Sequence, residues 1–321
     1  MKFDYIIIGA GSAGCVLSNR LSENQNNKVA VFEAGGTSDI WKVKMPLALL
    51  YTMHDPKYNW KYYSEPEPHL NNRRLFCPRG KMIGGCSAHN GMVFVRGNRN
   101  DYERWENFGL KSWSYEKVLP YFKKIETWSG GENQYRGSLG PLPVNQSKND
   151  NPLFKAFINS ASEAGHTVNP DMNGEEQEGF GMFDTTIHEG QRASATKYYL
   201  NPAKKRKNLN IFSNSFVEKI IFEGKKAIGI EVKIKNKVEK VYAEKEVILS
   251  GGSINSPQLL MLSGVGNSDH LKEKGIDVVS NIKGVGKNLQ DHLETYIMQE
   301  CKTPDTLYTY TKLIPKVLAG M

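Results

Sequence analysis

A strand, a glycine-rich turn and a helix open the chain, and no other feature restricts its fold as strongly. Residues 4–8 form an apolar run with three consecutive isoleucines, as expected of a parallel strand buried on both faces. The turn Gly9-Ala-Gly-Ser-Ala-Gly14 follows, and apolar residues then recur at helical spacing. A second apolar strand over 29–32 ends at Glu33. This order predicts an α/β fold with a Rossmann-like, doubly wound sheet.

Each residue of this motif has a physical task at a dinucleotide site. Gly9 permits the tight turn, Gly11 lets the backbone approach a pyrophosphate, and Gly14 lets the helix pack close to the strand. The helix N-terminus offers unpaired N–H groups to phosphate. Glu33 stands where an acidic side chain accepts a hydrogen bond from a ribose hydroxyl. The motif predicts a bound dinucleotide and leaves open whether it is FAD or NAD.

Two further glycine-rich segments point to the same cofactor. Residues 80–97 are too polar for a core element, and the small Gly-Gly-Cys-Ser turn within them lets backbone amides approach a flavin or a phosphate. Residues 251–266 follow a predicted strand that ends at Leu249. There we expect a short helix that begins at Ser256 (N-cap) and Pro257 (N1) and is closed by Gly264.

These segments together resemble the glucose–methanol–choline (GMC) oxidoreductases, the FAD-dependent alcohol dehydrogenases and oxidases. The resemblance rests on the opening turn and on residues 80–97, 252–266 and 284–292, and it extends over essentially the whole chain. Within the family it is most similar to the members that oxidise choline and related small alcohols. It implies FAD as the cofactor, a small alcohol as the substrate and hydride transfer to flavin N5, with the electron acceptor left open.

The resemblance also implies FAD contacts, position by position. They fall in the opening turn, at the end of the second strand, within residues 80–97 and at the start of a predicted β-meander. The residues concerned are Gly9, Gly11, Ser12, Gly14, Glu33, Met82, Gly85, Ser87, His89, Asn90, Gly91, Met92, Val93 and Val217.

His89 has two interpretations. The sequence Gly-Gly-Cys-Ser-Ala-His-Asn over 84–90 resembles family members in which the corresponding histidine is joined covalently to the flavin 8α-methyl group. Such a bond requires a neutral imidazole nitrogen, which a histidine with its usual pKa supplies. The alternative is a histidine that packs beside the flavin, hydrogen-bonded and unlinked.

The resemblance predicts a discontinuous FAD domain. We expect residues 1–147 and 191–287 to form the FAD-binding domain, with the β-meander at 217–249. Residues 148–190 and 288–321 are expected to belong to an α+β substrate domain with an antiparallel sheet. A helix is predicted over 152–165, because Leu153, Phe154 and Phe157 share one helical face.

The family's catalytic histidine pair has no match in this chain, so the sequence assigns no catalytic base and places that pair C-terminal to residue 321. Two classes of function stay open. The first is an FAD-dependent alcohol oxidoreductase, a dehydrogenase rather than an oxidase, of which this is the N-terminal part. The second is a non-catalytic flavin-binding protein. An NAD-dependent dehydrogenase does not explain residues 80–97.

Composition excludes several other classes. The 42 Lys and Arg against 34 Asp and Glu give a net charge of +8, but much of the excess lies within 204–245, where it is interpreted as solvated turns and strand faces. Nucleic-acid binding is therefore not expected. The four cysteines have no zinc spacing, so no metal site is predicted, and reduced thiols favour a cytoplasmic location, at most peripheral to the inner membrane. No transmembrane segment is visible.

Overall fold

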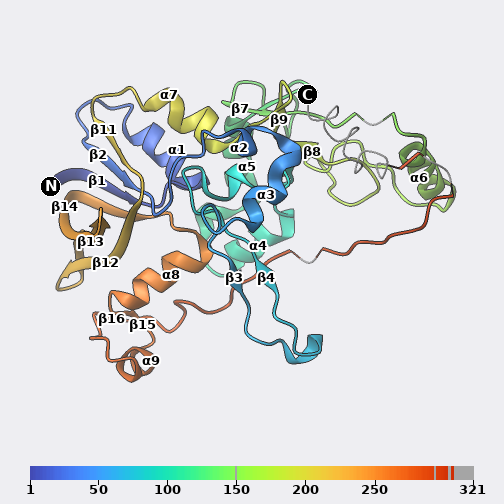
Figure 1. Ribbon diagram of the computed structural model, residues 1–321. Helices are drawn as coiled ribbons and strands as arrows, with labels where there is room; N and C mark the ends of the chain where they lie inside the picture. Colours follow the sequence, from blue (N-terminus) through green and yellow to red (C-terminus); the bar gives the residue numbers. More distant parts are fainter. Residues whose placement is uncertain (149, 293, 303–304, 307–321) are drawn as a thin grey trace. The chain divides into compact units, whose positions relative to one another are not determined.

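Strand β1 (Lys2–Ile8) lies inside a six-stranded sheet, as the apolar opening predicts (Figure 1). It pairs in parallel with β2 (Val29–Phe32) on one side and with the second half of β14 (Lys237–Leu249) on the other. The α/β class is thus confirmed. The full order is β11-β2-β1-β14-β13-β12, where β11 is Leu209–Phe212, β12 is Ser215–Glu223 and β13 is Lys226–Ile234.

The computed structural model describes residues 1–148, 150–292, 294–302 and 305–306. The chain divides into two units. The first contains residues 1–44, 48–90 and 194–293, and the second contains residues 45–47, 91–193 and 294–321. Residues 91–147 therefore pack within the second unit rather than with the opening strands. The assignment of segments to an FAD domain and a substrate domain stays a prediction, and much of the predicted final segment, 288–321, lies outside the described residues.

The predicted meander is present, because β12, β13 and β14 are antiparallel neighbours. Residues with positive φ form its turns. Gly224 has a φ of +56° between β12 and β13, and Lys235 and Asn236 have φ values of +47° and +66° between β13 and β14. Two successive positive φ values are typical of the two-residue turns whose twist matches a hairpin. β14 then continues past the meander to pair with β1.

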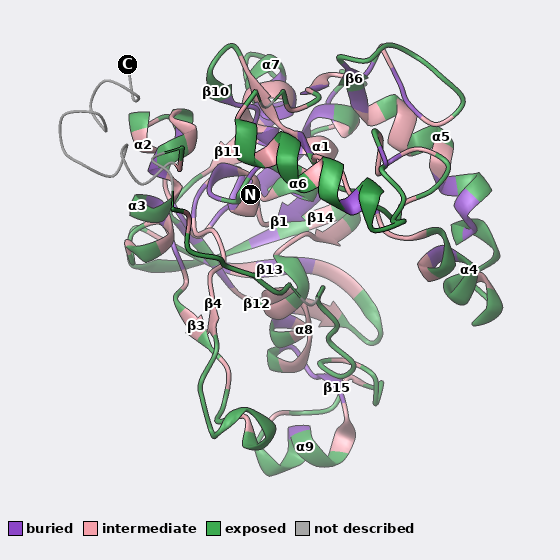
Figure 2. Ribbon diagram, turned by 90° about the vertical axis from the view of Figure 1, so that its right-hand side faces the viewer, coloured by how far each residue is buried: buried purple, intermediate pink, exposed green. Residues whose placement is uncertain are grey.

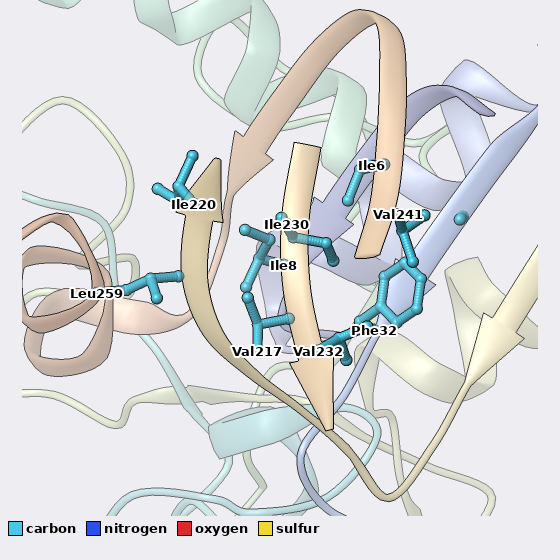
Figure 3. Close-up of a cluster of buried hydrophobic side chains, with 10 residues drawn as sticks. Ile6, Ile8, Phe32, Val217, Ile220, Ile230, Val232, Val241 and Leu259 are labelled. Atoms are coloured by element: carbon cyan, nitrogen blue, oxygen red, sulfur yellow. The ribbon is translucent and has the colours of Figure 1, made fainter. Parts of the chain in front are cut away.

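The core of the first unit lies on one face of this sheet (Figure 3). Ile6 and Ile8 of β1 pack there with Phe32 of β2, with residues of the meander and with Leu259 of α8 (Gly252–Leu262). Helix α1 (Ser12–Leu21) packs against β1 and β2 but contributes no side chain to this cluster, so it covers the opposite face. Helices on both faces of parallel strands are the doubly wound arrangement.

The remaining elements of the first unit are short. The C-terminal end of β1 is buried, whereas α9 (Ser268–Glu273) is mostly exposed (Figure 2). The others are α2 (Trp41–Lys44), α3 (Leu49–His54), β3 (Tyr62–Tyr63), η2 (Pro68–Leu70), β4 (Phe76–Cys77), η3 (Gly85–Ala88), η5 (Thr196–Leu200), α7 (Asn201–Ala203), β15 (Val265–Gly266) and β16 (Ser280–Asn281). Of the turn η1 (Pro46–Ala48), only Ala48 belongs to this unit.

The second unit combines helices with two- and three-residue strands. The predicted helix over 152–165 is present as α6 (Pro152–Glu163); the Asn151 side chain accepts a hydrogen bond from the backbone of Leu153, and Pro152 occupies the first turn. The other elements are α4 (Arg99–Asn107), η4 (Lys111–Trp113), α5 (Tyr115–Ile125), the antiparallel pairs β5 (Val93–Phe94) with β8 (Asp184–Thr185) and β9 (Ile187–His188) with β10 (Gln191–Arg192), and the parallel pair β6 (Glu126–Trp128) with β7 (Leu142–Val144).

A buried ionic network lies inside the second unit. Glu126, fully buried, accepts hydrogen bonds from Arg96 Nη2 at 2.7 Å and from Arg136 Nε at 2.9 Å. The Arg136 guanidinium also pairs with Asp171 at 2.6 Å and Asp184 at 2.7 Å. Buried charges are tolerated only when paired and hydrogen-bonded, so these five side chains depend on one another.

Candidate functional site

A cavity of about 510 Å³ lies in the first unit at the carboxyl ends of β1, β2 and β14. Its walls come from the opening turn and the start of α1, the end of β2, Trp60 and Tyr62, residues 79–80 and 85–86, the start of β12 and most of α8. The carboxyl edge of parallel strands is where α/β sheets bind their ligands. The cavity is therefore the candidate site.

Two of the three glycines of the opening turn are required by the packing of the protein itself, and the third is not. Gly9 has a φ of +96°, and a Cβ there would lie 2.6 Å from the Ser250 carbonyl oxygen. A Cβ on Gly14 would lie 1.9 Å from the Gly9 carbonyl oxygen, so only glycine lets α1 pack this close. A Cβ on Gly11, in contrast, would meet nothing closer than 3.9 Å. Since Gly11 also lines the cavity, the space beside it is open to a ligand.

The start of α1 presents unpaired N–H groups to the cavity. Gly11 is the N-cap residue, no side chain caps the helix, and its first turn contains no acidic residue. Ser12 and Ala13 both line the cavity. The first N–H groups of a helix lack intrahelical partners and carry its positive dipole end. This end of α1 therefore suits the phosphates of a dinucleotide.

Glu33 lines the cavity and is also tied to the backbone. Its two carboxylate oxygens accept hydrogen bonds from the N–H groups of Ala10 and Gly35, each at 2.9 Å. Burial raises the pKa of Glu33, and these two N–H groups act against that rise. Each carboxylate oxygen keeps a second lone pair, so Glu33 can still accept from a ribose hydroxyl. The sequence motif indicated the ribose contact but not the bond to Ala10, which holds the turn.

A second glycine turn packs on the first. The N–H of Gly84 donates to the Ala10 carbonyl at 2.7 Å, and a Cβ on Gly85 would lie 2.8 Å from Gly11 Cα. Gly84 and Gly85 both have positive φ, +94° and +52°. Ser87 Oγ donates to the Gly84 carbonyl and accepts from the Ala195 N–H, which fixes the turn from behind. Gly80, Gly85 and Cys86 of this segment thus line the cavity.

The structure brings some of the predicted contact residues to the cavity and leaves others beside it. Gly9, Gly11, Ser12, Glu33, Gly85 and Val217 line it. Gly14, Met82, Ser87, His89 and Asn90 belong to the same unit but are not among the lining residues; Met82 is buried against Val43 and Ala88, and His89 is 3% exposed. Gly91, Met92 and Val93 belong to the second unit. The assignment of all fourteen residues as FAD contacts stays a prediction.

Several lining residues had no role in the sequence analysis. Trp60 and Tyr62 stack with ring centroids 5.9 Å apart, and Phe216 lies 6.1 Å from Trp60. Arg79 and Asn255 also line the cavity. Lys61, between Trp60 and Tyr62, has a φ of +55°, so the strand alternation that would place residues two apart on the same side does not predict this pair.

The predicted start of the helix at Ser256 and Pro257 is wrong. Helix α8 begins at Gly252, with Gly251 as its N-cap, and Pro257 lies inside it. The tight turn after β14 lets the helix begin at once, and a proline so near the N-terminus removes only one intrahelical hydrogen bond. The predicted end is confirmed, because Gly264 has a φ of +89° just after the C-cap Ser263.

Two further features bear on chemistry at the site. Burial raises the pKa of the Cys15 thiol to about 12, so that cysteine is a poor nucleophile, whereas Cys86 lines the cavity. In the described part of the chain, no three His, Cys, Asp or Glu side chains gather as a metal site would require. None of the helices in that part has the length and apolar composition of a membrane span.

The fold and the cavity define a dinucleotide-binding α/β protein. The chain belongs to the GMC oxidoreductase family, since the family model described as "GMC oxidoreductase" matches residues 3–294. Members of this family are FAD-dependent oxidoreductases that act on CH–OH donors.

Curated relatives match the chain over its whole length. It is 48% identical over 327 residues to the mitochondrial choline dehydrogenase of Homo sapiens, with all of this chain and 55% of the relative aligned. It is 49% identical over 321 residues to the oxygen-dependent choline dehydrogenase of Brucella suis biovar 1, with 58% of that protein aligned. The chain thus spans somewhat more than half the length of the relatives it matches.

Solved structures share the fold. The pyridoxine 4-oxidase from Mesorbium loti superposes with a TM-score of 0.84 at 31% identity, over 88% of this chain and 55% of that one. The formate oxidase of Aspergillus oryzae RIB40, studied for its FAD modification, superposes with a TM-score of 0.83 at 28% identity, over 91% of this chain and 52% of that one.

Proposed function

We propose that this chain holds FAD in the cavity and forms the cofactor platform of an enzyme that oxidises a small primary alcohol, choline or a choline-like one, to its aldehyde. The open space beside Gly11 carries the proposal, because nothing in the protein itself requires glycine there. The choline dehydrogenases among the relatives support the alcohol, and family membership supports the cofactor.

The residues of the cavity fit FAD by their chemistry. The N–H groups at the start of α1 bind the pyrophosphate, and Gly11 leaves room for it to approach. Glu33 accepts from the ribose, and the backbone at Val217 lies where the adenine is expected. Bound FAD supplies a hydride acceptor for the alcohol carbon. The proposal assigns no proton acceptor to a described residue.

A non-catalytic flavin-binding protein is the second candidate, and the absence of an assigned base among the described residues favours it. Anaerobic addition of choline to the FAD-loaded chain separates the two. Loss of the visible flavin absorbance on addition of choline supports the enzyme. Unchanged absorbance supports the binding protein, provided that dithionite has been shown to reduce the bound FAD.

We propose a cytoplasmic location, at most peripheral to the inner membrane, with the electron acceptor left open.

Substitution of Gly11 by alanine is expected to weaken FAD binding at least tenfold without unfolding the chain. The added methyl group fills the space in front of the helix N-terminus, and the φ of −71° and ψ of −162° at Gly11 are accessible to alanine. Titration of the chain with FAD, followed by flavin fluorescence, measures the loss. Gly284→Ala is the matched control, because Gly284 has no neighbour within 4 Å of an added Cβ and lies away from the cavity. Equal affinity in Gly11→Ala and the unmodified chain would contradict the proposal.

We further propose that His89 is linked covalently to FAD. The imidazole is 3% exposed, and it directly follows the 3₁₀ turn η3, which includes the lining residues Gly85 and Cys86. The denatured chain is expected to keep its flavin absorbance and to exceed the polypeptide mass by one FAD. His89→Ala should release all of the flavin on denaturation, whereas His166→Ala, at an exposed histidine of the second unit, should retain it. Complete release from the unmodified chain would support the unlinked histidine instead.

A further inference from the structure

A two-stranded ribbon, residues 60–79, reaches the cavity only through its base. Its strands β3 and β4 pair Tyr62 with Cys77 and Tyr63 with Phe76, and isolated bridges join Asn59 to Gly80 and Glu67 to Arg73. From 61 to 80 every residue is exposed or half-buried, and the ribbon extends away from the sheet (Figure 1). An isolated two-stranded ribbon is marginally stable at best. Its position at the cavity therefore depends on the contacts at its base.

One side-chain hydrogen bond ties this base to a different wall of the cavity. The Tyr62 hydroxyl donates to Asn255 Oδ1 of α8 at 2.6 Å, across 193 residues of sequence. Both side chains line the cavity. Burial raises the pKa of Tyr62, so the phenol stays protonated and can donate at neutral pH.

Backbone hydrogen bonds from the Trp60 N–H to Arg79 and from the Lys81 N–H to Tyr58 join the two sides of the base to each other, but not to α8. The Trp60 ring stacks on Tyr62, and the Lys81 ammonium lies 4.8 Å from the Trp60 centroid. Arg79 pairs with Asp291 at 3.6 Å, where the Asp291 side chain is 79% exposed, and such surface pairs contribute little. Tyr62–Asn255 is thus the directional contact between the ribbon and α8.

We propose that the Tyr62–Asn255 hydrogen bond is a latch that holds the base of the ribbon across the cavity and retains the FAD bound there. The inference rests on the proposed FAD site and adds a retention role for Tyr62 and Asn255. Breaking one hydrogen bond is expected to accelerate FAD release about three- to tenfold. FAD binding should accelerate as well, because the open ribbon admits the cofactor more often.

Tyr62→Phe tests the latch, since it removes the hydroxyl and keeps the ring that stacks on Trp60. Tyr63→Phe is the matched control: it is the next residue of the strand, 52% exposed, and does not line the cavity. FAD release is followed by flavin fluorescence after dilution, with His89→Ala present in every chain so that no covalent bond holds the cofactor. Asn255→Ala should reproduce Tyr62→Phe, and the double variant should release FAD no faster than either.

If Tyr62→Phe and Tyr63→Phe bind FAD and release it at the same rate, the latch is wrong. The proposed FAD site is not affected by that result. Failure of the parent chain to bind FAD would instead overturn the proposed function. In that case, limited trypsin cleavage of the FAD-free chain still tests the hydrogen bond between the ribbon and α8. Trypsin can cut after Arg73 and Arg74, which lie in the exposed part of the ribbon. Faster cleavage there in Tyr62→Phe than in Tyr63→Phe supports it, and equal cleavage contradicts it.

Discussion

Glu126→Gln is expected to destabilise the chain by about 3–5 kcal/mol, the usual cost of removing one partner from a buried ion pair. Glu126 accepts four hydrogen bonds, from Arg96, from two nitrogens of Arg136 and from the Gly137 N–H. An amide oxygen can accept only some of these, and the amide NH₂ would face guanidinium donors. Arg96, whose side chain is 3% exposed, would lose the carboxylate it contacts.

Thermal unfolding measures this effect, with an expected fall in the midpoint of roughly 10 °C. Glu116→Gln is the control, because Glu116 pairs with Arg99 on the surface, where both side chains are more than half exposed. Its loss should stay below about 1 kcal/mol. Similar midpoints for the two variants would show that the buried network does not stabilise the second unit.

Gly14→Ala is expected to prevent the first unit from folding or to cost about 4 kcal/mol or more. The new Cβ would overlap the Gly9 carbonyl oxygen at 1.9 Å, and both sides of that contact are backbone. Relief requires α1 to move away from β1, which opens the buried packing around Cys15.

Gly11→Ala is the control that shows whether the effect of Gly14→Ala comes from the close contact at Gly14. The two substitutions add the same methyl group three residues apart, yet Gly11 has open space beside it. Far-UV circular dichroism and thermal melts should therefore show a folded Gly11→Ala chain and an unfolded or strongly destabilised Gly14→Ala chain. A Gly14→Ala melt within a few degrees of the parent would mean that α1 does not need this close approach.

Local patterns predict much of the first unit. The apolar runs at 4–8 and 29–32 become adjacent parallel strands, and the alternation over 217–249 becomes the meander. These predictions succeed because burial on both faces and two-residue periodicity are properties of a short stretch of sequence. Gly14 likewise meets the Gly9 carbonyl oxygen, which the motif itself supplies.

Long-range contacts account for what the sequence did not predict. The bond from Tyr62 to Asn255 joins residues far apart in the chain, and no local pattern marks either one as its partner. Arg136 lies in a stretch that is rich in glycine and polar residues, yet it is fully buried and pairs with Glu126, Asp171 and Asp184. Composition alone gives no sign of such a network, since each residue type is usually exposed.

The position of β14 late in the sequence determines how long β1 lacks this pairing partner during translation. β1 emerges from the ribosome before β14, whose residues 242–249 are its partner on one side. At about 5–20 residues per second, translation reaches that partner roughly 12 to 50 seconds after β1. Throughout that interval one edge of an apolar strand has no pairing partner, and exposed edges promote aggregation. Ribosome-bound chains shorter than about 240 residues are therefore expected to depend on chaperones that cover this edge.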